Sequence, residues 1–210
     1  MDLYNYIRSC NKCVLCNNQA PVLQKKDNTD VDVFWVGLSA VRISDKRDVP
    51  LSDNTNSGKL ISSIEFFIPE VSFYKTNLVK CLPLKDEKIR YPSKNEMKTC
   101  FFHLENEIDS LNPSLVFLLG KQVASFVLNK YGINEYSLDD DFFYESFEVE
   151  NLKFIPIHHP SYILVYKRKR LQEYIKNIEN IINECLLEKQ GKTIDNQLDI
   201  QTNMNNLVPA

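Results

Sequence analysis

The chain lacks the features that place a protein in a membrane or outside the cell. Among its 210 residues, no apolar run approaches the ~20 residues that a membrane-spanning helix needs. The opening residues, Met1-Asp-Leu-Tyr-Asn-Tyr6, are polar and acidic and do not form the apolar segment of a signal peptide. We therefore expect a cytoplasmic protein.

The chain also lacks the small size of a disulfide scaffold, although it contains six cysteines. Secreted disulfide-rich domains are short chains that cannot build an adequate core. This chain is 43% hydrophobic and is long enough to bury its own core. The cysteines therefore need another explanation.

Positive charge is not in excess, because the formal net charge is −3. This value argues against a generally basic nucleic-acid binder, so only the local distribution of charge is informative. The stretch 135–150 is acidic and includes Asp139, Asp140, Asp141, Glu145 and Glu148. The run Lys167-Arg168-Lys169-Arg170 is basic and directly follows the segment that begins with a His-His-Pro-Ser turn. Such a run is usually a solvated helix face and does not by itself indicate contact with phosphate.

Apolar patterning predicts strands alternating with helices. We expect strands over 31–37, 73–79 and 114–119, helices over 57–68, 93–111, 122–130 and 171–187, and a hairpin of 144–149 with 152–156. Strands that are apolar throughout are buried on both faces, as in parallel sheets. The pattern predicts an α/β fold, a three-layer αβα sandwich with a mostly parallel central sheet, as a single domain over 1–188. Residues 189–210 are polar and aperiodic and are predicted to form a disordered tail.

Cysteines from distant segments indicate a metal centre. Two lie near the start of the chain, one follows the strand 73–79, and one lies on the helix 93–111; they are Cys10, Cys13, Cys81 and Cys100. Four thiolates of this kind hold iron-sulfur clusters. The alternative is that the last two are ordinary buried residues, since free cysteine packs as a small hydrophobe. Cys16 could also be a ligand, in a second pair with Cys13, and spacing alone does not decide between the pairs Cys10–Cys13 and Cys13–Cys16. Cys185 is left over.

Polar residues follow the predicted strands at the edge where ligands bind in open α/β sheets, the carboxyl ends of the strands. The segments there are 37–41, 77–81, the turn at Gly120, and His158-His-Pro-Ser161. The last of these offers an imidazole and a hydroxyl, and Asn77 offers an amide donor and acceptor. Each also has a structural interpretation, as a histidine with internal partners and as a turn-forming asparagine.

Short motifs follow one another in a specific order: Cys10-x-x-Cys13-x-Leu15, Val36-Gly37, Pro50-Leu51, Ser57-Gly58-Lys59-Leu60, Thr76-Asn77-Leu78-Val79-Lys80-Cys81, Arg90-Tyr-Pro92 with Glu96 and Cys100, and His159-Pro160-Ser161. Over roughly residues 8–187 this order resembles the uracil-DNA glycosylase superfamily, specifically its iron-sulfur branches, families 4 and 5. The resemblance implies that the fold is uracil-DNA glycosylase-like. It also implies a structural 4Fe-4S cluster on Cys10, Cys13, Cys81 and Cys100, with Cys16 spare.

The resemblance further implies a monomeric enzyme whose partner is DNA. Such an enzyme extrudes a nucleotide and reads the exposed base. Asn77 would read the pyrimidine edge, and His159 would stabilise the negative charge that develops on O2 of the departing base. Tyr162 or Ile163 would fill the vacated stack from the minor groove. The residues expected to contact the DNA backbone or its groove are Ser57, Lys59, Ser161, Tyr162, Lys167, Arg168, Lys169 and Arg170.

The first motif departs from the family pattern. The family commonly has an acidic or amide side chain there to position the attacking water, whereas this chain reads Gly37-Leu38-Ser39-Ala40-Val41. Ser39, Asp45 or Asp48 could hold water, and the sequence does not choose among them.

The predicted base pocket, formed by Gly37, Leu38, Leu51 and Asn77, also departs from the family pattern. Leu51 stands where the family usually has a phenylalanine that stacks on the flipped base, a contact worth ~1–3 kcal/mol. Ile89 replaces an asparagine next to Arg90. Both changes predict a wider pocket.

Three hypotheses follow. The first is a monofunctional DNA glycosylase that acts on uracil or on a bulkier modified pyrimidine. The second is an antiphage defence glycosylase that excises hypermodified cytosine, such as glucosylated hydroxymethylcytosine, from phage DNA. The third is a non-catalytic iron-sulfur DNA-binding module; the presence of both Asn77 and His159 counts against it, since a pure binder needs neither.

Overall fold

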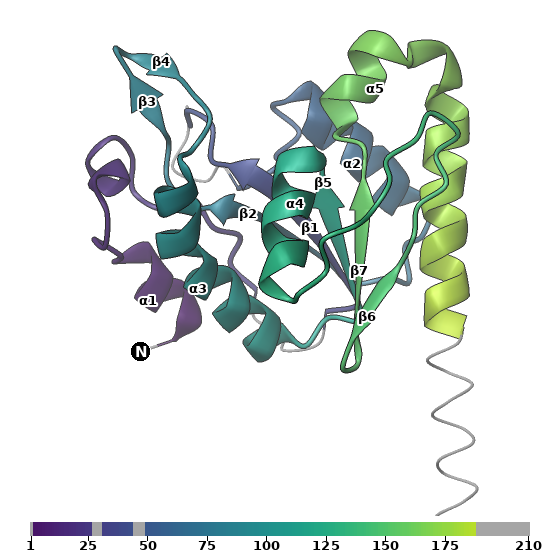
Figure 1. Cartoon of the computed structure of the whole chain (residues 1–210), viewed down its shortest axis with the longest axis horizontal. Coiled ribbons are helices and arrows are strands. Elements are labelled where there is room, and N and C mark those ends of the chain that lie inside the picture. Colours follow the sequence, from purple (N-terminus) through teal and green to yellow (C-terminus); the bar gives the residue numbers. More distant parts are fainter. Residues whose placement is uncertain (1, 27–30, 44–48, 188–210) are drawn as a thin grey trace, which may run out of the picture.

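The computed structural model describes residues 2–26, 31–43 and 49–187 (Figure 1). Its main sheet has five strands in the order β2-β1-β5-β7-β6. Four are parallel, namely β1 (Val33–Ser39), β2 (Phe73–Val79), β5 (Leu115–Leu119) and β7 (Leu152–Ile157), and β6 (Phe147–Val149) runs antiparallel to β7. A separate small hairpin pairs β3 (Leu84–Lys85) with β4 (Lys88–Ile89). The predicted α/β class and mostly parallel sheet are confirmed.

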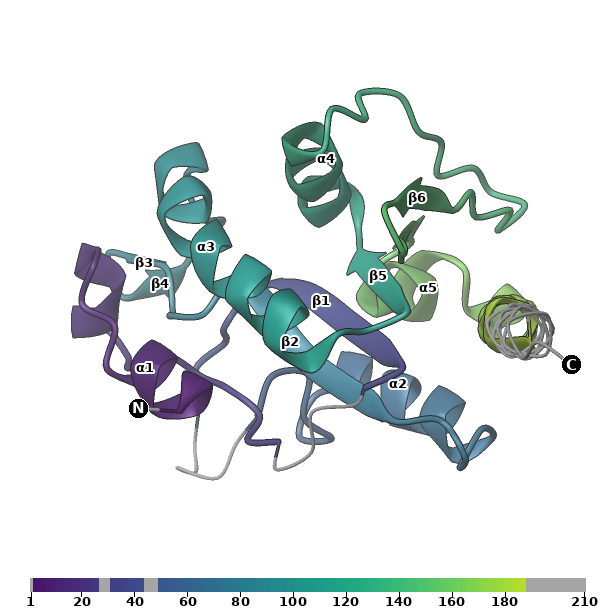
Figure 2. The same cartoon turned by 90° about the horizontal axis from the view of Figure 1, so that it is seen from below.

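Helices cover both faces of the sheet. One face carries α3 (Lys94–Leu111) and α4 (Lys121–Lys130), and α1 (Leu3–Arg8) packs against α3. The other face carries α2 (Asn56–Phe66), α5 (Pro160–Tyr166) and a helix over 171–187. Figure 2 shows the sheet between α3 and α4 on one side and α2 on the other. Two short 3-10 helices, η1 (Val14–Asn17) and η2 (Arg168–Arg170), complete the described elements.

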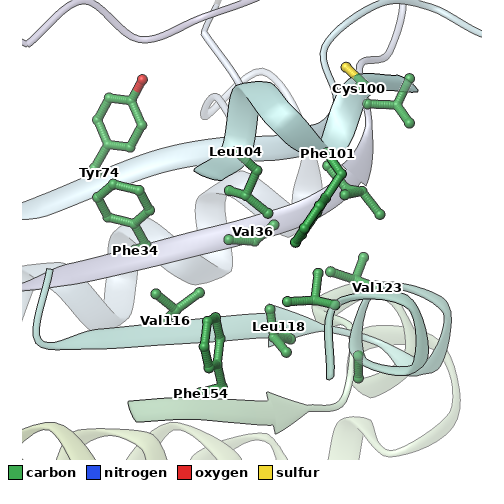
Figure 3. Packing of buried hydrophobic residues seen from close by; sticks show 14 of the residues in the cluster. Phe34, Val36, Tyr74, Cys100, Phe101, Leu104, Val116, Leu118, Val123 and Phe154 are labelled. Atoms are coloured by element: carbon green, nitrogen blue, oxygen red, sulfur yellow. The ribbon is translucent and has the colours of Figure 1, made fainter. Parts of the chain in front are cut away.

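The strands are buried on both faces because nearly all their residues are apolar. Phe34 and Val36 of β1 pack toward α3 and α4, and Val33 and Trp35 pack toward α2. Figure 3 shows the first of these cores, where side chains of β1, β2 and β5 meet Leu104 of α3. In a sheet covered on both faces, ligands bind at the carboxyl ends of the strands, so we expect the binding chemistry there.

Most element boundaries follow local rules. The helix α3 begins with a capping box, in which Ser93 accepts from the backbone N–H of Glu96 and Glu96 accepts from that of Ser93. It ends at Asn112, whose φ of 44° is left-handed. The predicted strands, hairpin and helices all occur, with shifts of a few residues at their ends.

The prediction missed several short elements: α1, η1, α5, η2 and the β3–β4 hairpin. None of the described helices combines the length and hydropathy that a bilayer crossing needs. The predicted tail, 189–210, lies outside the described residues.

Candidate active site and candidate metal centre

The carboxyl ends of the parallel strands open into a cleft of about 930 Å³. Its wall contains most of the residues that the sequence singled out for binding or chemistry: Gly37, Leu38, Ser39, Leu51, Ser57, Asn77, His159 and Ser161. The predicted contact residues Lys59, Tyr162 and the run Lys167–Arg170 are not part of this wall. The fold therefore gathers the candidate chemistry in one place and leaves the candidate backbone contacts outside it.

Asn77 lies against Gly37 at the floor of the cleft. The parallel register of β1 and β2 pairs these two residues. A Cβ atom added at Gly37 would lie 2.4 Å from Oδ1 of Asn77, so only glycine leaves space for the amide. The amide makes no hydrogen bond to any other described residue, although Asn77 is only 4% exposed. A buried amide without such a partner is suited to read a ligand by hydrogen bonds.

Leu51 forms the wall beside this amide in an unusual backbone conformation. Its φ is 54°, a left-handed value that costs a non-glycine residue roughly 1–2 kcal/mol. The loop is held because Gly58, in the first turn of α2, packs directly on the backbone of Leu51 and Ser52. Thr55 caps α2 by accepting from the N–H of Gly58 at 3.0 Å. Leu51 is therefore kept at the cleft by its surroundings, as strained residues at functional sites are.

His159 presents a defined tautomer. It is the N-cap of α5, and its Nδ1 accepts from the backbone N–H of Ser161 at 3.1 Å, with the Ser161 hydroxyl 2.8 Å away. Because a backbone N–H can only donate, the proton of the neutral ring resides on Nε2. Burial lowers the pKa of His159 below its ordinary value, which keeps the ring neutral at pH 7. Gly120, with φ of 90°, allows a close approach to the histidine.

His158, the neighbour of His159, belongs to a buried aromatic group. Its Nδ1 lies 3.0 Å from the Tyr144 hydroxyl, and its carbonyl accepts from the Tyr174 hydroxyl at 2.9 Å. Its ring stacks on Tyr162 with centroids 5.1 Å apart. His158 is absent from the cleft wall, so of the two histidines His159 is the one placed for chemistry.

The structure corrects one of the two residues predicted to enter the DNA stack. Ile163, a residue of α5, is fully buried in the core, so the prediction that it inserts into a duplex is wrong. Tyr162 remains the candidate for this insertion; it is half-buried, and its ring stacks on that of His158.

Acidic residues partly neutralise the basic run. Lys167 pairs with Asp140 at 2.8 Å, and Arg170 pairs with Glu173 at 2.5 Å while it also donates to the Asp140 carbonyl. Arg168 and Lys169 are exposed and make no ion pair with another described residue. Exposed ion pairs contribute little to stability, so phosphate can compete for the paired side chains.

A second, small cavity gathers thiols from distant segments. Five cysteines and one histidine line it: Cys10, Cys13, Cys16, Cys81, Cys100 and His103. None of the described cysteines forms a disulfide. Burial, followed by the nearby thiols, raises the pKa of Cys81 to about 12, and burial raises that of Cys100 to about 11. Thiols that resist ionisation side by side become good ligands once a cation compensates their charge.

The donor set of this cavity consists mainly of thiols, the ligand type that iron-sulfur clusters take. Among the described residues, no three His, Cys, Asp or Glu side chains are grouped closely enough to hold one metal ion. Soft thiolates spaced around a cavity fit a cluster, in which each iron takes its own ligand. Cys16 donates to the Cys13 carbonyl at 3.1 Å, which gives it a partner inside the protein. Cys185 lies elsewhere, 3.8 Å from Nζ of Lys153.

Two groups of site residues were missed by sequence reasoning. His103, whose Nε2 lies 3.0 Å from Sγ of Cys10, is one turn from Cys100 on α3, and that spacing was a usable signal. The other group is polar and belongs to the cleft wall: Arg42, Ser52, Asn54, Thr55 and Gln122. None of the motifs includes these residues; all but Gln122, in the first turn of α4, belong to loops.

Comparisons with known proteins agree with this geometry. The family model described as "Uracil DNA glycosylase superfamily" matches residues 25–183. A type-4 uracil-DNA glycosylase of Archaeoglobus fulgidus is 25% identical over 190 residues, which cover 88% of this chain and 92% of the relative. A type-4 uracil-DNA glycosylase of Thermotoga maritima is 26% identical over 191 residues, which cover 88% of this chain and 93% of the relative.

A solved structure supports the fold. The crystal structure of wild-type Pedobacter heparinus SMUG2 superposes with a TM-score of 0.51 at 14% identity, covering 74% of this chain and 76% of that one. At that identity the likeness concerns the fold alone.

Proposed function

The chain belongs to the uracil-DNA glycosylase superfamily, and from this premise we propose that it hydrolyses the N-glycosidic bond of a pyrimidine flipped out of DNA. The observation that carries the proposal is that Asn77 and His159 line one cleft, the first with an amide that has no other described partner and the second with its proton on Nε2. The membership and the names of the relatives support the coarser statement that the chain is a DNA glycosylase.

Each residue has a defined part in the proposed reaction. The Asn77 amide binds the edge of the base, and Nε2–H of His159 donates to O2 as the bond between C1′ and N1 breaks and its electron pair moves onto the base. A donor already in place at that oxygen stabilises the transition state without further reorganisation. Water then adds to C1′, and the proton that it loses passes to the base anion directly or through solvent, which gives a neutral free base and an abasic site.

The attacking water has no carboxylate beside it among the described residues of the cleft wall. We assign its positioning to Ser39, which ends β1 in that wall. Asp45 and Asp48, the other two candidates, lie outside the described residues. The sugar cation would then depend mainly on substrate phosphates and on the departing base held by His159.

The cleft also suggests a substrate class. Its volume of about 930 Å³ lies near the upper end of the usual range for ligand pockets, roughly 300–1,000 Å³. Leu51 takes less of this space than an aromatic ring would, and the wall beside it offers hydroxyl and amide groups from Ser52, Thr55, Ser57 and Gln122. We therefore propose that the pocket admits uracil and also a pyrimidine that carries a polar substituent.

The cysteine cavity is proposed to hold a 4Fe-4S cluster on Cys10, Cys13, Cys81 and Cys100. Such a cluster would supply a structural cross-link between segments far apart in the sequence. Cys10 and Cys13 lie in the link from α1 to η1, Cys81 follows β2, and Cys100 belongs to α3. The protein's own part is to bring these four thiols together and to shield them by burial.

The test is a panel of DNA duplexes that contain uracil, hydroxymethylcytosine, glucosylated hydroxymethylcytosine or deaminated purines. Released base is identified by mass spectrometry, and abasic sites are scored by alkaline cleavage. The matched control is the double variant Asn77→Ala/His159→Ala, which should release nothing from the same substrates. Tight binding by the native protein without release of any base would favour a non-catalytic DNA-binding module instead.

A further inference from the structure

A charged lysine is buried directly behind the base-reading strand. The Lys80 side chain is 1% exposed and forms an ion pair with Glu107 of α3, whose side chain is 0% exposed. Buried charges are costly unless they are paired and fully hydrogen-bonded. A pair at this position therefore needs an explanation beyond packing.

The hydrogen bonds of Lys80 lead to Asn77. Its Nζ donates to the Asn77 carbonyl at 2.7 Å, to Oγ1 of Thr76 at 2.7 Å, and to Glu107. These acceptors use all three donors of an ammonium group. Glu107 in turn accepts from Thr76 and from the Tyr74 hydroxyl at 3.0 Å. In Figure 3 that hydroxyl points away from the Phe34 ring.

The sheet topology explains why Asn77 needs this partner. The strand β2 is at the edge of the sheet, and among the described residues no strand lies on its outer side to accept or donate hydrogen bonds. Lys80 supplies a donor there for the Asn77 carbonyl. On the other side of the same residue, the amide rests on Gly37 and faces the cleft. The backbone carbonyl of Asn77 is thus held by the Lys80 ammonium group, and its side-chain amide is confined by Gly37.

Lys80 also reaches the cysteine cavity. Its backbone N–H donates to Sγ of Cys100 at 3.3 Å, and the residue is part of the cavity wall. One residue therefore touches both the base-reading asparagine and one of the proposed cluster ligands.

We propose that Lys80, with Glu107 as its counter-ion, is a positioning residue that sets the orientation of Asn77 and thereby the choice of base. The proposal rests on the function proposed above, in which Asn77 reads the base. Lys80 touches no substrate, so its effect must pass through Asn77.

The experiment compares Lys80→Met with Lys80→Met/Glu107→Gln. The double variant carries no buried charge, so it remains a test where the single variant fails to fold. Excision of uracil is measured in single turnovers, and base preference is measured as the ratio of affinities for DNA with 2′-fluoro-deoxyuridine and 2′-fluoro-deoxycytidine. We expect excision to fall by about 10- to 100-fold, since a displacement of about 1 Å costs a factor of this order. The affinity ratio should fall toward one.

Two controls separate positioning from general stability. Lys75→Met removes another ion-paired lysine of β2, one that faces Glu65 of α2 at 2.9 Å, and should leave the affinity ratio unchanged. In an Asn77→Ala background, Lys80→Met should cause no further loss of base preference, because the two changes act on one contact. Thermal unfolding of each variant reports stability separately.

An unchanged affinity ratio in both Lys80 variants would overturn the proposal. So would a loss of preference that is equally large in the Asn77→Ala background, since the effect would not pass through Asn77. The affinity ratio requires no bond cleavage. If the native protein discriminates the fluorinated nucleotides but releases no base, the proposed function fails while the positioning role is still tested.

Discussion

A single methyl group at Gly37 should disable the candidate base-reading site without unfolding the protein. In Gly37→Ala the new Cβ would lie 2.4 Å from Oδ1 of Asn77, whereas ordinary van der Waals contact begins near 3.4 Å. The amide must therefore retreat by about 1 Å, a displacement that typically costs about 100-fold in rate. That factor corresponds to about 2.7 kcal/mol of transition-state stabilisation.

The assay is single-turnover release of uracil from a duplex, followed in parallel with thermal unfolding. The midpoint of unfolding should stay close to that of the native protein, since Gly→Ala at an ordinary backbone conformation restricts the unfolded chain. The control is the same substitution in an Asn77→Ala background, where no Oδ1 is present and the added methyl group should cost little more. Native-like excision by Gly37→Ala would refute the reasoning, because it would mean that Asn77 reads nothing from its present position.

Four further outcomes test the metal, the leaving group, the protonation of His159 and the pocket. Purified without oxygen, the protein should be brown, and Cys16→Ser should keep the colour while Cys10→Ser loses it; the reverse result would mean that the ligand register is wrong. His159→Ala should lower single-turnover excision by about two to three orders of magnitude with little change in DNA affinity. In the native protein, the excision rate should be constant above neutral pH and should fall only below the ordinary histidine pKa. The pKa of His159 is lowered, so the ring becomes protonated only at a more acidic pH, where Nδ1 can no longer accept from the Ser161 N–H. Leu51→Phe should raise activity on uracil and exclude any larger base, since overpacking costs ~1–3 kcal/mol; equal activities in both enzymes would show that residue 51 does not line the base pocket.

The sheet was predictable because its strands carry their own signal. Apolar runs such as 115–119 have no polar face, so they specify a buried parallel strand without reference to their neighbours. The capping box at Ser93 fixes the start of α3 in the same local way. The helix α5 was missed because its N-cap is His159, a residue that seldom caps helices, and because it has only 7 residues.

The motifs predicted part of the residues that line the cleft and the cysteine cavity, but not their geometry. The motifs located Asn77, His159 and the cysteines, yet the tautomer of His159 depends on the Ser161 N–H and the space beside Asn77 depends on Gly37. The Lys80–Glu107 pair joins residues 27 positions apart, a separation that no helical or strand period reveals. Contacts of this kind are set by tertiary packing.

The basic run Lys167–Arg170 is paired with nearby carboxylates, and this pairing affects how DNA binding would respond to salt. Lys167 and Arg170 already carry carboxylate partners, whereas Arg168 and Lys169 are exposed and make no ion pair with another described residue. The steep dependence of DNA affinity on ionic strength comes from cations that leave the DNA when protein cations neutralise its phosphates, with a slope of about −0.9 for each phosphate neutralised. A carboxylate tethered to the protein stays beside the DNA and offsets part of the positive charge of its partner, so fewer cations leave the DNA. If the DNA backbone lies along the basic run, Asp140 and Glu173 act as built-in counter-ions. The run would then contact phosphate through four cations, but its DNA affinity would depend on salt as though it had fewer.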